Sequence, residues 1–579
     1  MLSTESIKVE INVPAKMRDG TILYADVYRP DQPAKFPAIL TRLPYNKNIS
    51  FPAGSGYMNP IRYARAGYAV VVQDVRGTGA SEGQANFWHQ ESEDGYDSVE
   101  WLAAQPWCDG QVGMFGFSYF GHTQLTAAVT RPAHLKAICP SQTYSVAHSF
   151  PFSLRGDKFR FQIHPIWSLM ISNLALLRSQ ADPARTRTLA NTLMKLVDNI
   201  KEQYSFLPLK DAPAAKLIDS MGMMPSYADI LLHKDDEAWW QELAGPLPLE
   251  KINVPAYHIA GWYDVDTLPG VIQTYQRIIE NSESEVARSN QKLIIGPWIH
   301  TAEMLSKVGE LEFGMSASGA VVDMAGLHIR WFDRWLKELD NGISAEPPVR
   351  IFVMGENRWR FENEWPLART RYTPYYFHSR GRANSQFGDG LLNTLPPDEE
   401  PFDSYLYDPR HPVPSQEMGM GAFNQQAVEE RPYVLVYTSA VLQTDLEVTG
   451  PVVISLFAAT SAVDTDFSAK LVDVWPDGKA YNVAEGIIRA GYRESGRELK
   501  PVEPGQINQY NLSLGATSNV FKSGHRIRVE ISSSDFPKWD RNLNTGHPIG
   551  QDAQIQLALQ SIFHQPGYPS HILLPVIPR

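Results

Sequence analysis

Cysteine is nearly absent from this chain, whose 579 residues contain only two, Cys108 and Cys139. Two cysteines do not make the disulfide framework of a small secreted domain, so we interpret both as small buried side chains in a reducing compartment. No apolar run is long enough to span a membrane, and the N-terminal MLSTESIKVEINV lacks the basic and apolar regions of a signal peptide. We therefore expect a soluble, cytoplasmic protein without a membrane partner.

The chain also lacks an excess of basic residues. It contains 52 Lys and Arg and 64 Asp and Glu, which gives a formal net charge of -12. Such a balance argues against a nucleic-acid backbone as partner. No cluster of His, Cys, Asp and Glu has the spacing of metal ligands, so we expect no metal and no cofactor. A small-molecule substrate is the expected partner, and a homo-oligomer is left open.

The first part of the chain alternates strand-like and helix-like segments. AVVVQDVRG (69–77), GQVGMFG (110–116) and LKAICPSQ (135–142) have the apolar runs of buried strands, and DGYDSVEWLAAQPW (94–107) has helical spacing. The pattern returns with VPAYHIAGWYDVD (254–266) and QKLIIGPWIH (291–300). This alternation predicts a mostly parallel sheet covered by helices, the α/β class.

Two other patterns accompany this one. Residues 146–246 are rich in Leu, Met and Ala at spacings of three and four, which predicts a helical insertion. Residues 370–579 contain short β-rich runs separated by turn residues, a pattern typical of a β-sandwich or jelly roll. The α/β part is then divided into 1–145 and 247–369.

The stretch GMFGFSYFGHTQ places Ser118 between a predicted strand and a predicted helix. This is the setting of a nucleophile elbow, the strained turn that exposes a catalytic serine. Gly116 leaves room where the backbone turns back, but Gly121 stands one place later than in the G-x-S-x-G form. On this motif alone, a turn or N-cap serine remains the alternative interpretation.

A serine nucleophile needs a histidine base, and the histidine needs a carboxylate to orient it. In α/β-hydrolases these residues follow in the order Ser, acid, His. Two predicted strands downstream of Ser118 lead to Asp264 and His300, at the edge where a parallel sheet presents its loops. Asp266 competes with Asp264, because side chains two residues apart on an extended segment point the same way. Other histidines are interpreted as packed, solvent-facing or rim residues: His89, His122, His134, His258 and His328.

Eight motifs carry a family resemblance over nearly the whole chain: MRDGTILYADVYRP, PYNK, DVRGTGASEG, DGYDSVEWLAAQPWCDGQVGMFGFSYFG, GWYD, GPWIH, VDTDFSAKLVDVWPDG and SSSDFPKWDRNLNTG. They resemble the serine hydrolases that group cocaine esterase with the α-amino-acid ester hydrolases and, more distantly, the X-prolyl dipeptidyl aminopeptidases. The resemblance implies an α/β-hydrolase domain (1–145 and 247–369), an inserted helical cap (146–246) and a C-terminal jelly roll (370–579). It also implies that Asp264, the Asp of GWYD, orients His300, which activates Ser118.

The family uses a tyrosine hydroxyl in its oxyanion hole, and FPAILTRLPYNK places Tyr45 at the matching position. The second donor would be the backbone N–H of Tyr119, the residue after the nucleophile. Without the resemblance, Tyr45 would be interpreted as a packed loop tyrosine.

Three further residues are candidates for substrate binding. Asp266 departs from cocaine esterase, whose equivalent position looks aromatic, and is similar to the carboxylates with which α-amino-acid ester hydrolases hold a substrate ammonium. We hypothesise that it favours a polar or cationic acyl group over benzoyl, the alternative being an exposed or hydrogen-bonded loop carboxylate. Trp167 and Phe117 are candidate pocket walls, although the helical spacing of Trp167 with Met170 and Ile171 is more typical of a core residue.

We therefore expect a serine hydrolase that cleaves small carboxylic esters through an acyl-enzyme. The same machinery would serve an amide-cleaving acylase, an α-amino-acid ester hydrolase or an X-Pro dipeptidyl aminopeptidase, and a requirement for a free substrate amine would separate the last two from a simple esterase. A carbohydrate-binding jelly-roll protein is the non-enzyme alternative. We also expect the jelly roll to lie against the hydrolase domain and to help wall the site.

Overall fold

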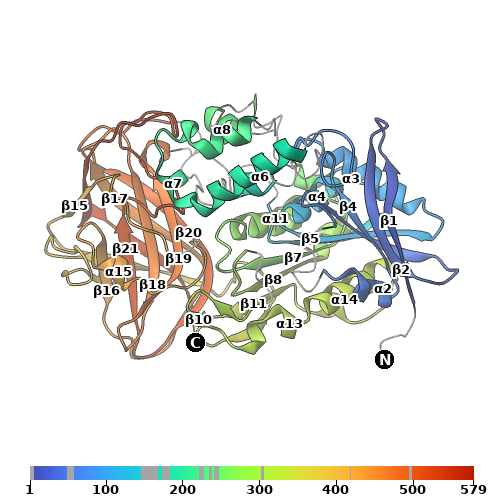
Figure 1. Cartoon of the computed structure of the whole chain (residues 1–579). Helices are drawn as coiled ribbons and strands as arrows, with labels where there is room; N and C mark the ends of the chain where they lie inside the picture. Colours follow the sequence, from blue (N-terminus) through green and yellow to red (C-terminus); the bar gives the residue numbers. More distant parts are fainter. Residues whose placement is uncertain are drawn as a thin grey trace.

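The computed structural model shows two β-containing units side by side, the N-terminal one in blue to yellow-green and the C-terminal one in orange and red (Figure 1). Parts of the segment expected to be helical, including residues 146–166 and 172–182, lie outside the described residues. The structure describes residues 6–48, 58–144, 167–171, 183–220, 227–233, 236, 238–239, 247–300, 305–416, 419–494 and 499–578.

A ten-stranded sheet forms the centre of the N-terminal unit, in the order β1-β2-β4-β3-β5-β6-β7-β8-β11-β12. The strands from β4 to β11 run parallel, and antiparallel strands flank them at both edges, as the sequence predicts for most of the sheet. The strands are β1 (Ile7–Lys16), β2 (Ile22–Pro30), β3 (Phe36–Leu43), β4 (Ala69–Asp74), β5 (Cys108–Phe117), β6 (Leu135–Ser141), β7 (Ala256–Gly261), β8 (Gln291–Gly296), β11 (Val349–Val353) and β12 (Arg358–Glu362).

Helices cover both faces of this sheet. Trp331 of α14 packs on one face with strand residues such as Ile259, and Leu125 of α4 packs on the other with Leu40 and Met114. This helix–sheet–helix layering is that of an α/β protein, the class that the sequence predicts. The helices are α2 (Pro60–Arg65), α3 (Glu91–Ala103), α4 (Tyr119–Val129), η3 (Leu249–Lys251), α11 (Leu268–Asn281), α12 (Glu285–Ser289), η4 (Met315–Ala317), α13 (Gly319–Val322), α14 (Met324–Leu336) and η5 (Ile343–Ala345).

The C-terminal unit is rich in β-structure. Its twelve-stranded sheet has the order β15-β22-β17-β24-β13-β14-β16-β21-β18-β19, with β20 paired to β17 and β23 to β22. In β20, Tyr510, Leu512 and Leu514 join the core while the residues between them face outward, the period of two expected of a half-buried strand. The elements are β13 (Arg371–His378), β14 (Leu391–Asn393), β15 (Asp403–Tyr407), α15 (Gln426–Glu429), β16 (Leu435–Ser439), β17 (Leu446–Thr460), β18 (Asp466–Val474), β19 (Ala480–Arg489), η6 (Ala490–Tyr492), β20 (Asn508–Phe521), β21 (Arg526–Ser532), β22 (Ala558–Gln565), β23 (Tyr568–Pro569) and β24 (His571–Ile577).

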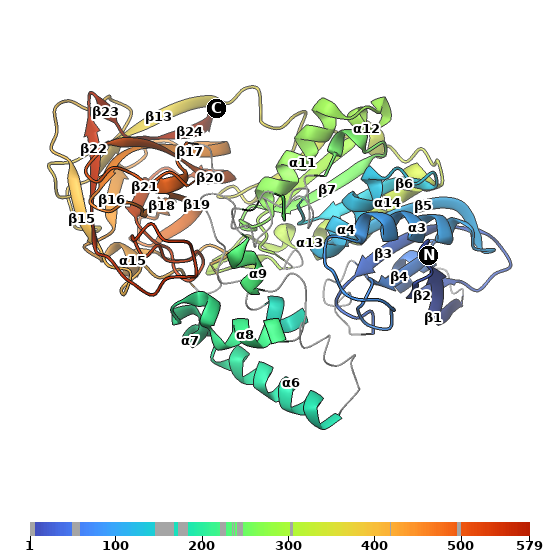
Figure 2. The ribbon, with the colours of Figure 1, turned by 90° about the horizontal axis from the view of Figure 1, so that it is seen from above.

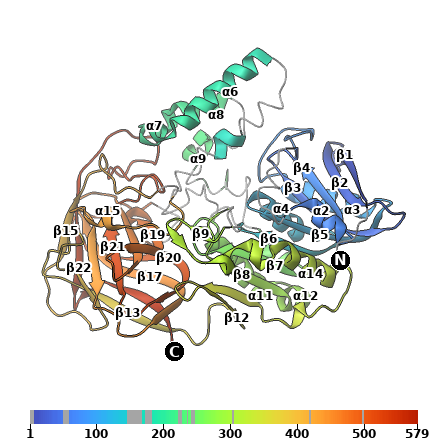
Figure 3. The same cartoon turned by 60° about the horizontal axis from the view of Figure 1, so that its bottom comes forward.

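The described regular elements of the segment between β6 and β7 are all helices. Figures 2 and 3 show α6, the longest helix among its described residues, standing out from the two β-containing units. The helix that follows α6 reaches the C-terminal unit, where Tyr204, Asp540 and Arg541 line one pocket and the Arg541 side chain donates to the Ser205 carbonyl at 2.8 Å. The elements are α6 (Pro183–Asp198), α7 (Ile200–Ser205), η2 (Leu209–Asp211), α8 (Pro213–Ser220) and α9 (Tyr227–Leu232).

The two β-containing units are joined by backbone hydrogen bonds. Met354, just after β11, donates to Ser518 of β20 and accepts from Val520 (2.9 and 2.8 Å). A second contact lies close to the C-terminal edge of the parallel sheet, where the hydroxyl of Tyr263 donates to the carbonyl of Asn482 at 3.2 Å. The hairpin of β9 (Lys307–Val308) and β10 (Leu311–Glu312) also meets the C-terminal unit. Across the described residues, no helix combines the length and the apolarity that a membrane crossing requires.

Candidate active site

Ser118 occupies a sharp turn between β5 and α4, as the elbow motif predicts. Its φ of 56° and ψ of -125° lie in a region that side chains rarely adopt, and α4 begins at the next residue. A Cβ on Gly121 would lie 2.6 Å from the Cβ of Thr143, so α4 can approach the chain after β6 only with glycine here. The late glycine of the motif therefore has a packing role of its own, which the sequence comparison with G-x-S-x-G does not reveal.

His300 lies within hydrogen-bonding distance of both Ser118 and Asp264. Its Nε2 is 3.0 Å from the Ser118 Oγ, and its Nδ1 is 3.0 Å from the Asp264 Oδ2. The three residues follow β5, β7 and β8, so the parallel sheet brings together side chains that are far apart in the sequence. The imidazole is partly exposed and the carboxylate fully buried.

Trp298 fixes the two loops that carry the imidazole and the carboxylate. A Cβ on Gly261 would collide with the carbonyl of Trp298, and one on Gly296 would collide with its indole ring. The Trp298 carbonyl accepts a hydrogen bond from the N–H of Tyr263 at 3.0 Å, and its indole N–H donates to Ala317 at 2.7 Å. Two glycines and one buried tryptophan thus hold the loops of Asp264 and His300 together.

Asp264 and Asp266 do not share one extended segment, which corrects the reasoning from sequence. The chain turns here, since the Asp264 carbonyl accepts hydrogen bonds from the N–H groups of Thr267 and Leu268 at 3.2 and 2.9 Å. The turn points the two carboxylates differently, and the Asp264 carboxylate meets His300. The Asp266 side chain is buried, with 8% of its surface exposed, so it is not the exposed loop carboxylate of the alternative interpretation.

Tyr45 follows β3 and lies next to Ser118. Burial raises the pKa of the Tyr45 phenol to about 12, and hydrogen bonds with Trp167 and Ser118 offset part of this rise. The Trp167 indole N–H donates to the phenol oxygen at 3.1 Å. A phenol that stays protonated and already accepts one hydrogen bond can donate its own proton to an oxyanion.

The two candidate wall residues both lie near these groups. The Trp167 ring is partly buried between Phe87 and Trp88, with centroids 5.6 and 5.5 Å away. The helical spacing of Trp167 is typical of a core residue, but its hydrogen bond to Tyr45 places it at the candidate site. The buried Phe117 ring lies 6.4 Å from the His300 ring.

The competing histidines are engaged elsewhere. His122 stacks on Tyr144, its Nδ1 is 3.2 Å from the Tyr144 carbonyl oxygen, and burial lowers its pKa to about 4. Burial likewise lowers the pKa of His258 to about 4 and of His328 to about 3. His134 pairs with Glu100, and His89 lies exposed on the surface.

Sequence reasoning missed two residues that support this site. Thr267 donates from its backbone N–H to the Asp264 Oδ1 at 3.3 Å and from its hydroxyl to Oδ2. Glu91 accepts a hydrogen bond from the Tyr119 hydroxyl at 2.8 Å. A signal for Thr267 exists, because Thr-Leu-Pro is a helix start, whereas Glu91 stands in no motif. Among the described residues, no group of three or more His, Cys, Asp or Glu could hold a metal ion.

Comparisons with known proteins cover nearly the whole chain. Residues 19–302 match the model of the X-Pro dipeptidyl-peptidase (S15) family, and residues 341–573 match that of the X-Pro dipeptidyl-peptidase C-terminal non-catalytic domain. The cocaine esterase of Rhodococcus sp. (strain MB1 Bresler) is 38% identical over 582 residues, which cover 99% of each chain.

Solved structures agree with these matches. An α-amino acid ester hydrolase has a TM-score of 0.80 at 25% identity, with 100% of this chain and 97% of that one covered. An aminopeptidase from a marine sediment Thaumarchaeota archaeon has a TM-score of 0.81 with the same coverage, and at 24% identity it shows the fold alone. These comparisons confirm the resemblance read from the eight motifs.

Proposed function

Because the chain belongs to the X-Pro dipeptidyl-peptidase (S15) family and is therefore a hydrolase, we propose that it cleaves small carboxylic esters through an acyl-enzyme on Ser118. The observation that carries this proposal is the hydrogen-bonded line from Ser118 through His300 to Asp264, with Ser118 on a strained turn. Hydroxyl, imidazole and carboxylate in this order are the groups of a serine hydrolase.

In the first half-reaction, His300 Nε2 takes the proton of the Ser118 hydroxyl as Oγ attacks the ester carbonyl carbon. The imidazolium then gives that proton to the departing alkoxide, so that the alcohol leaves and the acyl group stays bonded to the Ser118 Oγ. In the second, His300 takes a proton from water as the water oxygen attacks the acyl carbon. His300 then returns that proton to the Ser118 Oγ as the acyl–Oγ bond breaks and the acid is released. Asp264 accepts the Nδ1–H throughout, so the tautomer is held and the imidazolium is stabilised.

The Tyr45 hydroxyl and the Tyr119 backbone N–H are the proposed oxyanion donors. Tyr119 is the first residue of α4, so its N–H has no partner within the helix and points along the positive end of the helix dipole. The Tyr45 hydroxyl also lies beside the nucleophile, as its hydrogen bonds with Ser118 and Trp167 indicate. One aimed donor can contribute about 3–4 kcal/mol to transition-state stabilisation.

The other two segments complete the site in this proposal. The helices within 146–246 form a cap, supported by Trp167, which reaches Tyr45. The unit at 370–579 is a jelly roll that walls the site, supported by the hydrogen bond from Tyr263, the neighbour of Asp264, to Asn482. The hydrolase domain comprises 1–145 and 247–369.

Ester cleavage is favoured over amide cleavage by the similarity to an esterase over 99% of both chains. An α-amino-acid ester hydrolase, an amide-cleaving acylase and an X-Pro dipeptidyl-peptidase use the same groups, and the buried Asp266 is the residue that bears on this choice. A carboxylate near the acyl group would favour substrates with a free amine over benzoyl esters.

Activity-based labelling tests the proposal. The purified protein should hydrolyse p-nitrophenyl acetate and react covalently with a fluorophosphonate, and Ser118→Ala should abolish both. Ser205→Ala, which changes an exposed serine of α7, is the matched control and should leave both intact. A wild-type protein that neither turns over esters nor becomes labelled would refute the hydrolase mechanism and favour the carbohydrate-binding alternative.

A further inference from the structure

Tyr119 is held in position both by its backbone and by its side-chain hydroxyl. Its backbone starts α4 directly after Ser118, while its buried ring reaches the start of α3. There the hydroxyl accepts a hydrogen bond from the Trp88 N–H at 3.0 Å and donates one to the Glu91 Oε1 at 2.8 Å. The residue whose N–H is a proposed oxyanion donor is therefore anchored by its own phenol group.

Glu91 is itself firmly fixed. The Arg42 Nη1 lies 2.8 Å from the Glu91 Oε2, and the side chains of both residues are buried, with Arg42 0% and Glu91 4% exposed. Burial raises the pKa of Glu91, and the charge of Arg42 opposes that rise. A buried carboxylate needs such a partner, since an unpaired buried charge is strongly destabilising.

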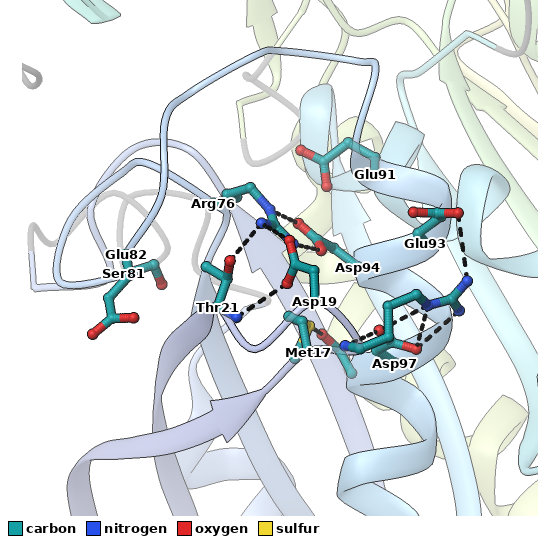
Figure 4. A network of polar contacts seen from close by, with 12 residues as sticks. Met17, Asp19, Thr21, Arg76, Ser81, Glu82, Glu91, Glu93, Asp94 and Asp97 are labelled. Atoms are coloured by element: carbon teal, nitrogen blue, oxygen red, sulfur yellow. Dashed lines mark hydrogen bonds and ion pairs between the residues drawn. The ribbon is translucent and has the colours of Figure 1, made fainter.

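A second ion-pair network fixes the first turn of α3 beside Glu91 (Figure 4). Arg76 donates from Nε and Nη2 to the two oxygens of Asp94 at 2.9 and 2.6 Å, and from Nη1 to Asp19 at 2.6 Å. Arg42 holds the Glu91 carboxylate directly, and this network holds the helix turn that carries Glu91. Glu91 is thus a fixed acceptor against which Tyr119 is positioned.

The same contacts lead to the other proposed donor. Trp88 has a φ of 69°, rare for a bulky residue, and its N–H is bound by the Tyr119 hydroxyl. Its ring lies 5.5 Å from that of Trp167, whose indole N–H donates to the Tyr45 hydroxyl. Both donors are therefore linked to Glu91 through side chains in contact with one another.

We propose that Glu91 is a positioning residue for the oxyanion hole, acting through the hydroxyl of Tyr119. This rests on the proposed function, since it assumes that the Tyr119 N–H and the Tyr45 hydroxyl bind the oxyanion. Loss of the Tyr119–Glu91 bond frees the ring that orients the first turn of α4. Donors must lie about 2.7–3.1 Å from the oxyanion, and a misplacement of about 1 Å can cost about a hundredfold in rate.

The alternative is that this bond only stabilises the fold, and Tyr68 provides the matched control. The Tyr68 hydroxyl donates to the Asp333 Oδ1 at 2.6 Å, so it is another buried tyrosine bound to a carboxylate of the α/β unit. We compare Tyr119→Phe with Tyr68→Phe well below their melting temperatures. The measured quantities are kcat and KM on p-nitrophenyl acetate, the Ki of phenylboronic acid and the Tm.

For Tyr119→Phe we expect kcat to fall by about tenfold with KM nearly unchanged, and the boronate Ki to rise by a similar factor. The boronate forms a tetrahedral adduct with the nucleophile, so its affinity measures how well the oxyanion hole binds a tetrahedral oxygen and not the stability of the fold. Tyr68→Phe should lower Tm while leaving kcat and Ki at their wild-type values.

Glu91→Gln is the second variant, because it keeps the shape of the side chain and removes its charge. Its amide oxygen is a weaker acceptor for the Tyr119 hydroxyl than the carboxylate is, so the variant should lower kcat in the same direction. Glu91→Gln/Tyr119→Phe should cost no more than the larger single effect, since Tyr119→Phe already removes the hydroxyl through which Glu91 acts. Wild-type kcat and Ki in both single variants, or additive losses in the double variant, would overturn the inference. In either case an active, fluorophosphonate-labelled wild type leaves the proposed function standing, whereas an inactive, unlabelled wild type refutes that function itself.

Discussion

Thr267 donates two hydrogen bonds to Asp264, one to each carboxylate oxygen. Its backbone N–H reaches Oδ1 at 3.3 Å, and its hydroxyl reaches Oδ2, the same oxygen that faces the His300 Nδ1. The carboxylate is fully buried, so these donors, and not water, set its orientation. Thr267 therefore helps to fix the orientation of the Asp264 carboxylate beside the His300 imidazole.

Thr267→Val removes the hydroxyl and keeps the shape of the side chain. A hydrogen bond to a charged group is worth about 1.5–3 kcal/mol, so we expect kcat/KM on p-nitrophenyl acetate to fall by about ten- to a hundredfold. Thr267→Ser keeps the hydroxyl and should retain most of the activity. Equal activity of the Val variant and the wild type would show that the backbone N–H alone suffices.

Trp167→Phe tests the bond between the indole N–H and the Tyr45 hydroxyl. Phenylalanine preserves ring contact with Trp88 and removes the donor, so we expect kcat to fall by about fivefold, the worth of one neutral hydrogen bond. Tyr45→Phe should cost more, about 10²–10³-fold, because it removes a proposed oxyanion donor itself.

The double variant Trp167→Phe/Tyr45→Phe separates the possible roles of Trp167. If Trp167 acts through Tyr45, its loss adds nothing once the Tyr45 hydroxyl is gone. Full additivity in kcat would instead assign Trp167 a separate contact with the substrate.

The meeting of Ser118 and His300 with a carboxylate follows from the sequence pattern, because the carboxyl ends of parallel strands share one edge of a sheet. The choice of Asp264 over Asp266 rests instead on the family resemblance. Buried apolar runs identify those strands, and the residues that end them identify the candidate groups. Tyr45 came instead from a family resemblance, since a loop tyrosine carries no local signal of its role.

The contacts that support these groups could not be predicted from the sequence. Glu91 meets Tyr119 across a gap of 28 residues, and only the relative placement of α3 and α4 creates that pair. The sequence predicts an extended chain after Asp264, whereas the helix start at Thr267-Leu268-Pro269 turns the chain there. How the helices of 146–246 dock likewise depends on tertiary contacts, which periodicity does not specify.

Asp266→Asn tests whether the buried carboxylate selects the acyl group. If Asp266 faces the acyl site, a substrate ammonium gains a charged partner there, and we expect kcat/KM for a phenylglycine ester to fall by about tenfold in the variant. The value for a benzoate ester, which carries no ammonium, is the control and should stay the same or rise. An unchanged ratio of the two would remove Asp266 from substrate selection.

Buried histidines should make the fold sensitive to acid. Burial lowers the pKa of His258 to about 4, against about 6.5 in an unfolded chain. The folded state therefore disfavours the protonated form, and the stabilisation is fully present above pH 6.5 and is lost as the pH falls from 6.5 toward 4. The free energy of unfolding should drop by about 1.4 kcal/mol per pH unit for this group.

His258→Gln tests this dependence, because glutamine can still bind the Gln291 Oε1 that His258 contacts at 2.9 Å and cannot take up a proton. Urea unfolding at pH 7, 6 and 5 should show a smaller loss of stability per pH unit in the variant than in the wild type. His411→Gln, which replaces an exposed histidine, should keep the wild-type slope. Burial lowers the pKa of His122 to about 4 and of His328 to about 3, so these two residues should steepen the acid response of the wild type and of the variant equally. A slope that His258→Gln leaves unchanged would mean that His258 is solvated or paired when it is charged.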